Sequence, residues 1–75
     1  ERKEYKAFEL KKHSVKVSGH LTSISMEEMF WEGLKSIAIK RNQSINSIVS
    51  EIDRKRIGNL SSAIRIYVYK NTNNY

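Results

Sequence analysis

The stretch Leu21-Thr22-Ser23-Ile24-Ser25-Met26, followed by the acidic pair Glu27-Glu28, decides the fold of this chain. Successive side chains of a strand point to opposite faces, and apolar and small polar residues alternate along this stretch. One face of the predicted strand then carries Thr22, Ile24 and Met26. The other face carries Leu21, Ser23 and Ser25.

Helical spacing replaces this alternation directly after the strand. Ser25 and Glu28 form a Ser-x-x-Glu capping box, which can satisfy unpaired amides at a helix start. We therefore predict a first helix from Glu27 to about Arg41, with Asn42 as a left-handed C-cap. Its apolar stripe comprises Phe30, Leu34, Ile37 and Ala38, with Met26 and Trp31 at the edge.

A second alternating segment, His13–Ser18, precedes the deciding stretch, with Val15 and Val17 on one face. These positions are odd, whereas the apolar positions of the next strand are even, so a turn or a bulge must separate the two. We favour a hairpin whose two-residue turn is Gly19-His20. It would pair Val17 with Thr22 and Val15 with Ile24, and would place Lys16 beside Ser23. The alternative is a bulge at Gly19 within one long strand.

Two further helices are predicted downstream. Ser44 caps the second helix, whose apolar residues Ile45, Ile48, Val49 and Ile52 lie on one face, and Gly58 ends it after a basic turn. Asn59 or Ser61 caps the last element, Leu60 to about Lys70. Its apolar residues suit a strand as well as a helix, and we favour the helix because it can pack back on the others.

The composition limits the class of protein. The chain has 75 residues, no cysteine and a formal charge of +6, which suits an anionic partner. A chain this short buries little surface alone, and without disulfides we expect shared burial in an oligomer. No apolar run reaches membrane-spanning length. We divide the chain into a charged arm (1–12), one domain (13–70) and a polar tail (71–75).

Catalysis is not expected. Cysteine nucleophiles and a glycine-rich phosphate loop are absent from the sequence, and His20 near Ser23 supplies at best two members of a catalytic triad. His13 and His20 have no carboxylates at metal-ligand spacing. We therefore predict that the protein is not an enzyme and needs no cofactor or metal.

The order of elements resembles the ribbon-helix-helix family of DNA-binding proteins. The resemblance rests on the strand from Leu21, the acidic start Glu27-Glu28, the apolar stripe of the first helix and Ser44-Ile45-Asn46-Ser47 opening the second. The longer match, from Ser14 to about Lys70, is similar to a bacterial subfamily with a C-terminal extension. It implies a mostly α-helical, intertwined homodimer with a short β-ribbon and about three helices per chain, in which the strand pairs with its own copy.

The resemblance also implies a function. The protein would bind double-stranded DNA in the bacterial cytoplasm, at the nucleoid, as a transcriptional repressor or regulator, and pairing of dimers on DNA is left open. Base contacts map to Leu21, Ser23 and Ser25, and phosphate contacts to Lys16, Ser44, Ile45 and Asn46. The joint dimer core would contain Ile24, Met26, Trp31, Leu34, Ile37, Ile48 and Ile52.

One alternative remains open. Some proteins of this type resemble antitoxins, which use a C-terminal segment to bind another protein. The element Leu60 to Lys70 would supply that surface here. The rival prediction is therefore a protein-interaction module rather than a DNA-reading one.

Overall fold

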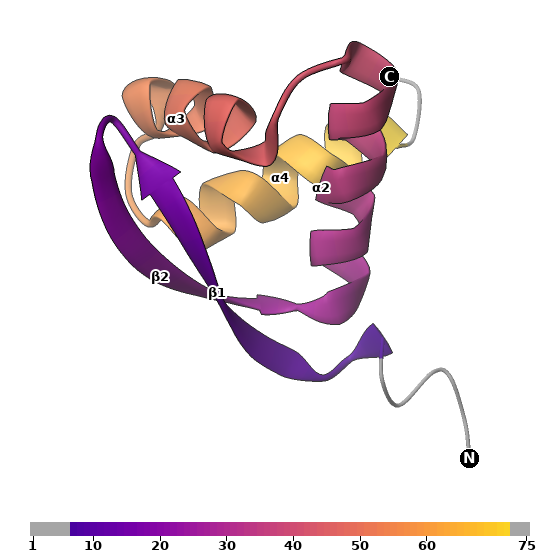
Figure 1. Ribbon diagram of the computed structural model, residues 1–75. Coiled ribbons are helices and arrows are strands. Elements are labelled where there is room, and N and C mark those ends of the chain that lie inside the picture. The colour runs from indigo at the N-terminus through magenta and orange to yellow at the C-terminus, as the bar shows by residue number, and fades with distance from the viewer. Residues whose placement is uncertain (1–6, 73–75) are drawn as a thin grey trace.

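The computed structural model describes residues 7–72, so the first half of the predicted arm (1–6) and the last three residues of the predicted tail (73–75) lie outside the described residues. A two-stranded antiparallel ribbon is followed by three helices (Figure 1). The ribbon consists of β1 (Leu10–Val17) and β2 (His20–Glu27). The helices are α2 (Glu28–Arg41), α3 (Ile45–Lys55) and α4 (Leu60–Thr72).

The hairpin is confirmed, but its turn lies one residue earlier than predicted. Ser18 and Gly19 occupy the turn with φ of 50° and 86°, and positive φ at both positions is characteristic of a type I′ turn. Val17 therefore pairs with His20 and Val15 with Thr22. The predicted pairing with Gly19-His20 as the turn is wrong by two residues. Because a shift of two preserves the faces, the apolar residues still share one side.

The strand β2 is not alone in its chain. It pairs along its whole length with β1, and β1 begins at Leu10, three residues before the predicted strand. The hairpin thus supplies one partner strand of β2 within the chain. Pairing with a copy remains a proposal for the other edge of β2.

The helices pack against one face of the ribbon. In Figure 1 the turn end of the ribbon lies beside α3, and its other end leads into α2. Twelve apolar residues are buried in this single chain: Val15, Val17, Ile24, Met26, Leu34, Ile37, Ala38, Ile48, Val49, Ile52, Ile64 and Val68. Six of the seven residues predicted for a dimer core are among them, and Trp31 packs at the edge. Their burial does not require a second chain.

The start of α2 differs from the prediction. The N-cap residue is Glu27 and makes no side-chain capping bond, so the Ser25–Glu28 capping box does not form. The amide of Glu28 instead donates to the carbonyl of Glu9, at 2.9 Å. Ser25 is still in the strand at this point, paired with Lys12. The residue that precedes β1 thus replaces the local cap.

The other helix ends follow the sequence closely. Asn42 is left-handed with φ of 56° and caps α2, and the hydroxyl of Ser44 accepts from the amide of Ser47 at 3.0 Å at the start of α3. Asn59 rather than Ser61 caps the last element, since its side chain accepts from the amide of Ser62 at 3.2 Å. That element is a helix, as predicted, and it continues to Thr72.

Two contacts fix α4 against the rest of the fold. A Cβ on Gly33 would lie 2.7 Å from Cγ1 of Val68, so α2 and α4 approach closely there. At the strand–helix junction, the guanidinium of Arg65 donates to both carboxylate oxygens of Glu27, at 2.7 and 3.2 Å. This bidentate geometry is the stronger kind of ion pair.

The Glu27–Arg65 pair predicts an acid-sensitive part of the stability. Hydrogen bonding from Arg65 lowers the pKa of Glu27 below the ordinary value of 4.5, and a backbone hydrogen bond adds to this. The contribution is therefore present above pH 4.5 and is lost as the pH falls through the lowered pKa. We expect Arg65→Met to lower the unfolding free energy at neutral pH and to flatten its acid dependence. Urea titrations over a pH series measure both effects.

Arg54→Met provides the matched control. Arg54 is exposed and makes no ion pair with a described residue. We expect its replacement to leave the acid dependence as in the wild type. An equal effect of the two substitutions would show that the Glu27–Arg65 pair adds nothing specific.

Candidate nucleic-acid interface

The outer face of the ribbon is polar, narrow and open. Because the inner face takes the apolar positions, parity sends the intervening residues outward. All six central outward residues are exposed: Lys12, Ser14 and Lys16 from β1, and Leu21, Ser23 and Ser25 from β2. Cross-strand pairing sets each lysine or serine of β1 opposite a residue of β2. The three residues predicted to contact bases thus lie together on one strand.

Two members of this face were not predicted. Lys12 was assigned to the N-terminal arm, and Ser14 was given no role. The register places Ser14 opposite Ser23 and Lys12 opposite Ser25. Alternate residues of a strand share a face, so extending the strand back from Lys16 would have placed Ser14 and Lys12 on the same face.

The electrostatics of the ribbon favour an anion. Four acidic residues of the described chain are held in ion pairs with lysine or arginine, namely Glu27, Glu32, Glu51 and Asp53, and a carboxylate oxygen of Glu28 lies 3.0 Å from Nε2 of His13. Lys12 and Lys16 make no ion pair with any described residue. Their two charges are therefore available to an external partner.

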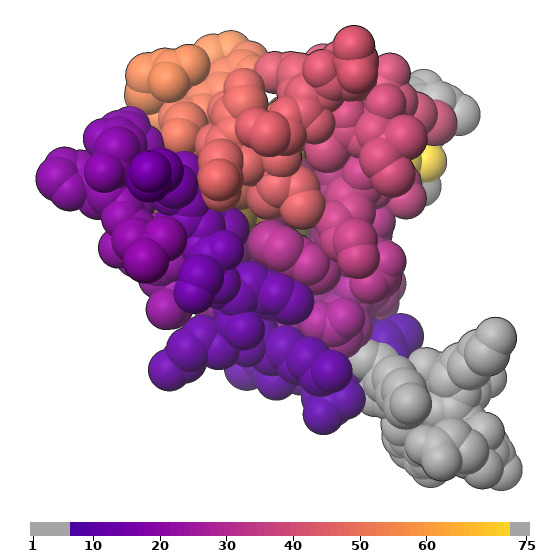
Figure 2. Space-filling model, in the orientation of Figure 1, coloured from indigo at the N-terminus to yellow at the C-terminus, as the bar shows by residue number. Residues whose placement is uncertain are grey.

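Hydrogen bonds to the backbone of Lys16 join α3 to β1. The amide of Lys16 donates to Oδ1 of Asn46 at 2.9 Å. One turn later, the hydroxyl of Ser50 donates to the carbonyl of Lys16 at 3.4 Å and accepts from the amide of Ser18 at 3.2 Å. These bonds cover the outer edge of β1 and bring the helix start next to the lysine. In the space-filling view, the surface of the ribbon accordingly runs into that of α3 (Figure 2).

The structure thereby gathers the four residues predicted to contact phosphate. Ser44 uses its hydroxyl as the cap, and Asn46 uses its carboxamide oxygen on the amide of Lys16. Among the described residues, the backbone amides of Ile45 and Asn46 have no acceptor, as expected in the first turn of a helix. Such amides and the helix dipole favour an anion.

Trp31 lies away from this face. Its ring stacks on His13 with centroids 3.9 Å apart and planes at 8°. Nε2 of His13 lies 3.0 Å from the carboxylate of Glu28, so the stack ties β1 to the first turn of α2. The basic turn Arg54-Lys55-Arg56 is also elsewhere, with Lys55 and Arg56 paired to acids on their own helix. The structure gives Trp31 a packing role.

Two other kinds of site receive no support in residues 7–72. No helix there combines the length and apolar character needed to cross a membrane. Over the same residues, no cluster of three histidine or acidic side chains could hold a metal ion.

Comparison with known proteins identifies the fold and the family. The model of the ribbon-helix-helix domain matches residues 10–72. No curated protein sequence matches the chain. Among solved structures, an uncharacterized protein from Bordetella pertussis Tohama I is similar, with a TM-score of 0.76 and 19% identity over 91% of this chain. This chain spans 59% of that protein, and at such low identity the likeness concerns the fold alone. Since the family model covers the ribbon and all three helices, the chain belongs to the ribbon-helix-helix family.

Proposed function

We propose that the protein binds double-stranded DNA by placing the outer face of its ribbon in the major groove. The observation that carries the proposal is the pair of uncompensated lysines, Lys12 and Lys16, beside small polar residues on a narrow two-stranded ribbon. A B-DNA major groove is about 12 Å wide and admits such a ribbon. In this role the protein is a bacterial transcriptional regulator acting at the nucleoid, and we favour a repressor.

We expect two kinds of contact: base contacts, which give sequence specificity, and phosphate contacts, which position the protein on the duplex. Ser23 and Ser25 are short and can each reach one base edge, and Leu21, which is 75% exposed, can meet a thymine methyl group. Lys12, Lys16 and the free amides of Ile45 and Asn46 would hold phosphates. Because bidentate side chains are absent from the β2 face, we expect most of the affinity to come from phosphate contacts.

The salt dependence of DNA binding tests this division. Each phosphate contact releases counterions, so the affinity should fall steeply with salt. We expect Lys12→Ala and Lys16→Ala each to reduce the log–log slope by about one per bound chain, which is about two for a homodimer, and to weaken all sequences about equally. Lys40→Ala is the control, because Lys40 is exposed at the end of α2, outside the ribbon. Affinity that does not change with salt would exclude phosphate contact.

We also propose that the protein is a homodimer joined through the free edge of β2. In the dimer, β2 and its copy form the central strand pair that enters the groove, and β1 of each chain flanks this pair beside the phosphates. In a two-residue hairpin, Val17 and His20 exchange backbone bonds, so the backbone groups of Lys16, Leu21 and Ser23 point outward. Those of Lys16 are occupied by α3. Those of Leu21 and Ser23 have no partner among the described residues. An unpaired strand edge is a template for another strand.

The dimer predicts a melting temperature that rises with protein concentration. We expect Ser23→Pro to remove this dependence, because proline deletes the outward amide while its strand position is tolerated at an edge. Ser14→Pro makes the same change on the β1 edge and should leave the dependence intact. A wild-type protein that is monomeric at micromolar concentration would contradict the dimer proposal. It would not contradict the proposal that the ribbon binds DNA.

The second candidate function, a protein-interaction module using α4, also has an observation in its favour. A groove between α3 and α4 is open to solvent and largely apolar.

A further inference from the structure

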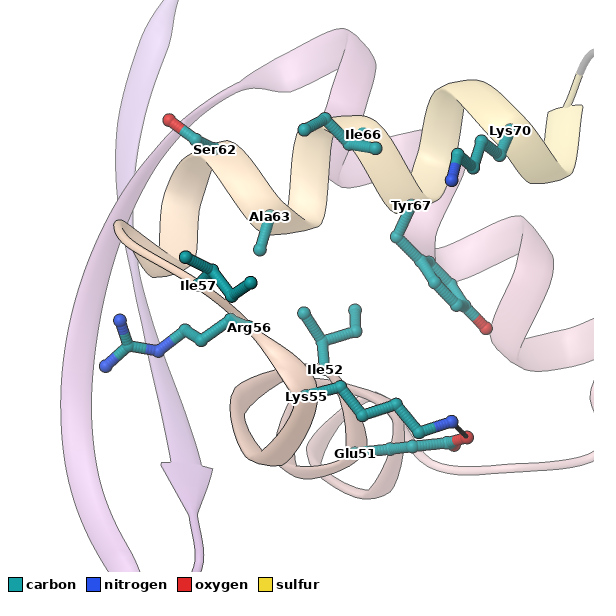
Figure 3. A pocket seen from close by; sticks show the side chains of 10 residues that line it. All are labelled: Glu51, Ile52, Lys55, Arg56, Ile57, Ser62, Ala63, Ile66, Tyr67 and Lys70. Carbon is teal, nitrogen blue, oxygen red and sulfur yellow. Dashed lines mark ion pairs between the residues drawn. The ribbon is translucent and has the colours of Figure 1, made fainter.

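The groove between α3 and α4 has a cavity volume of about 360 Å³ (Figure 3). Ile52 and Ala63 form its apolar floor, and Ile57, in the connection between the helices, points toward Ala63. Ile57 is 99% exposed although isoleucine gains from burial. The groove therefore presents apolar surface that the folded chain leaves in water.

A second hollow continues this surface on the other side of α4. Phe30 and Tyr69 line it, and Ile66 and Lys70 line both hollows. Ile66 is 56% exposed and Tyr69 is 55% exposed. An apolar strip that crosses a helix from one hollow to the next exceeds what one small ligand covers, and exposed strips of this kind mark protein contacts.

The charged side chains around the apolar strip favour a negatively charged partner. Four basic side chains line the two hollows, Lys55, Arg56, Arg65 and Lys70, and the first three are paired with Glu51, Asp53 and Glu27. Glu51 is the only acidic residue among those lining either hollow, and it is held by Lys55 at 3.5 Å (Figure 3). Lys70 makes no ion pair with a described residue. A second copy of the chain has a formal charge of +6, so it would bring positive charge against these basic side chains.

The groove lies on the side of α3 that faces away from the ribbon. Asn46 and Ser50 bond to β1, whereas Lys55 lines the groove. Nine residues, or about two and a half helical turns, separate Asn46 from Lys55, which sets them on opposite faces. A partner in the groove would therefore leave the outer face of the ribbon free.

We propose that the α3–α4 groove docks an acidic amphipathic helix of a second protein. Its apolar residues would insert against Ile52, Ile57 and Ile66, and its carboxylates would reach Lys70, whose charge no described acid compensates. A helix that lays its apolar face into a groove is a common mode of recognition. This inference goes beyond the DNA-binding proposal, since it assigns a second surface that can be occupied while DNA is bound.

Two synthetic peptides test the proposal. Both are amphipathic helices of about five turns with leucine on one face; one carries glutamate on the polar face and the other lysine. Binding is followed by nuclear magnetic resonance of the isotopically labelled chain. We expect the acidic peptide to bind and to shift the amide signals of Ile57, Ala63, Ile66 and Lys70. Equal binding of both peptides, or shifts on the ribbon instead, would overturn the proposal.

Variants separate the groove from other surfaces. We expect Ile66→Ser to weaken the acidic peptide about tenfold, the scale of one good interface contact, and Lys70→Glu to shift the preference toward the basic peptide. Ile39→Ser is the matched control, because Ile39 is 80% exposed but lines neither hollow. Lys12→Ala should leave peptide binding unchanged.

Three results would contradict the assignment of the partner. The first is an equal loss of binding in Ile39→Ser and Ile66→Ser. The second is conversion of a dimer to a monomer by Ile66→Ser, which would make a second copy the occupant. The third is displacement of the acidic peptide by duplex DNA, which would assign the basic rim to phosphate.

Discussion

Replacing Ser23 with glutamate is expected to abolish DNA binding and to leave the chain folded. Ser23 lies on the outer face opposite Ser14, with Lys12 and Lys16 at the diagonal positions, about 7–8 Å away in an antiparallel pair. A carboxylate there would offset the charge of both lysines and would meet the phosphates with like charge. In the folded ribbon it is tolerated, because the position is exposed and its diagonal neighbours are basic.

The experiment pairs DNA titration with thermal melting by circular dichroism. Ser36→Glu is the matched control, because Ser36 is an exposed serine on α2, outside the ribbon. We expect the control to bind DNA nearly as the wild type does. If Ser23→Glu binds normally while folded, another face meets DNA.

The second large effect concerns stability. Leu34 and Ile48 have 0% exposure and belong to the single core formed by the ribbon and the helices. We expect Leu34→Ala or Ile48→Ala to cost about 2–5 kcal/mol, through lost burial and the cavity left behind. The free energy of unfolding of a small domain is only slightly larger than this cost. We therefore expect either variant to be largely unfolded and to show little cooperative melting.

Ile39→Ala is the comparison for this measurement. Ile39 is 80% exposed on α2, so the same deletion should change the unfolding free energy by about 0.5 kcal/mol or less. Urea unfolding of the three variants gives the values. Wild-type stability for both core variants would mean that α2 and α3 do not pack as described.

Local patterns in the sequence predicted the helices and the faces of the strands. The apolar residues of α3, starting at Ile45, repeat with the helical period, and Ser44 as its cap depends only on residues within one turn. The same holds for Asn42 at the end of α2. Alternation in β2 fixed which side chains point outward, because parity depends on no distant contact.

Contacts between distant residues account for what the sequence missed. A two-residue shift of the hairpin keeps every face, so alternation could not separate a turn at Ser18-Gly19 from one at Gly19-His20. The capping box failed because the carbonyl of Glu9, far away in sequence, receives the amide of Glu28. The core is buried within one chain because α4 packs on the other helices. The sequence pattern of α4 suits a strand as well as a helix, so this packing could not be predicted from it.

The candidate interface was predicted in part for the same reason. Leu21, Ser23 and Ser25 follow from the parity of one strand. Lys12 and Ser14 join them only through the register of the hairpin, which brings β1 beside β2. The α3–α4 groove has no local signature, because Ile57 and Ile66 fall outside the apolar stripes that define the core.

Mapping of DNA contacts by nuclear magnetic resonance shows directly whether the outer face of the ribbon binds DNA. A short duplex is added to the isotopically labelled chain at low salt, and shifts of the amide signals are followed for residues 7–72. We expect the largest shifts on the ribbon, smaller shifts at Ile45 and Asn46, and none along the outer face of α4. The ribbon residues concerned are Lys12, Ser14, Lys16, Leu21, Ser23 and Ser25. Shifts concentrated on α4 and the end of α3, with the ribbon unchanged, would contradict this expectation.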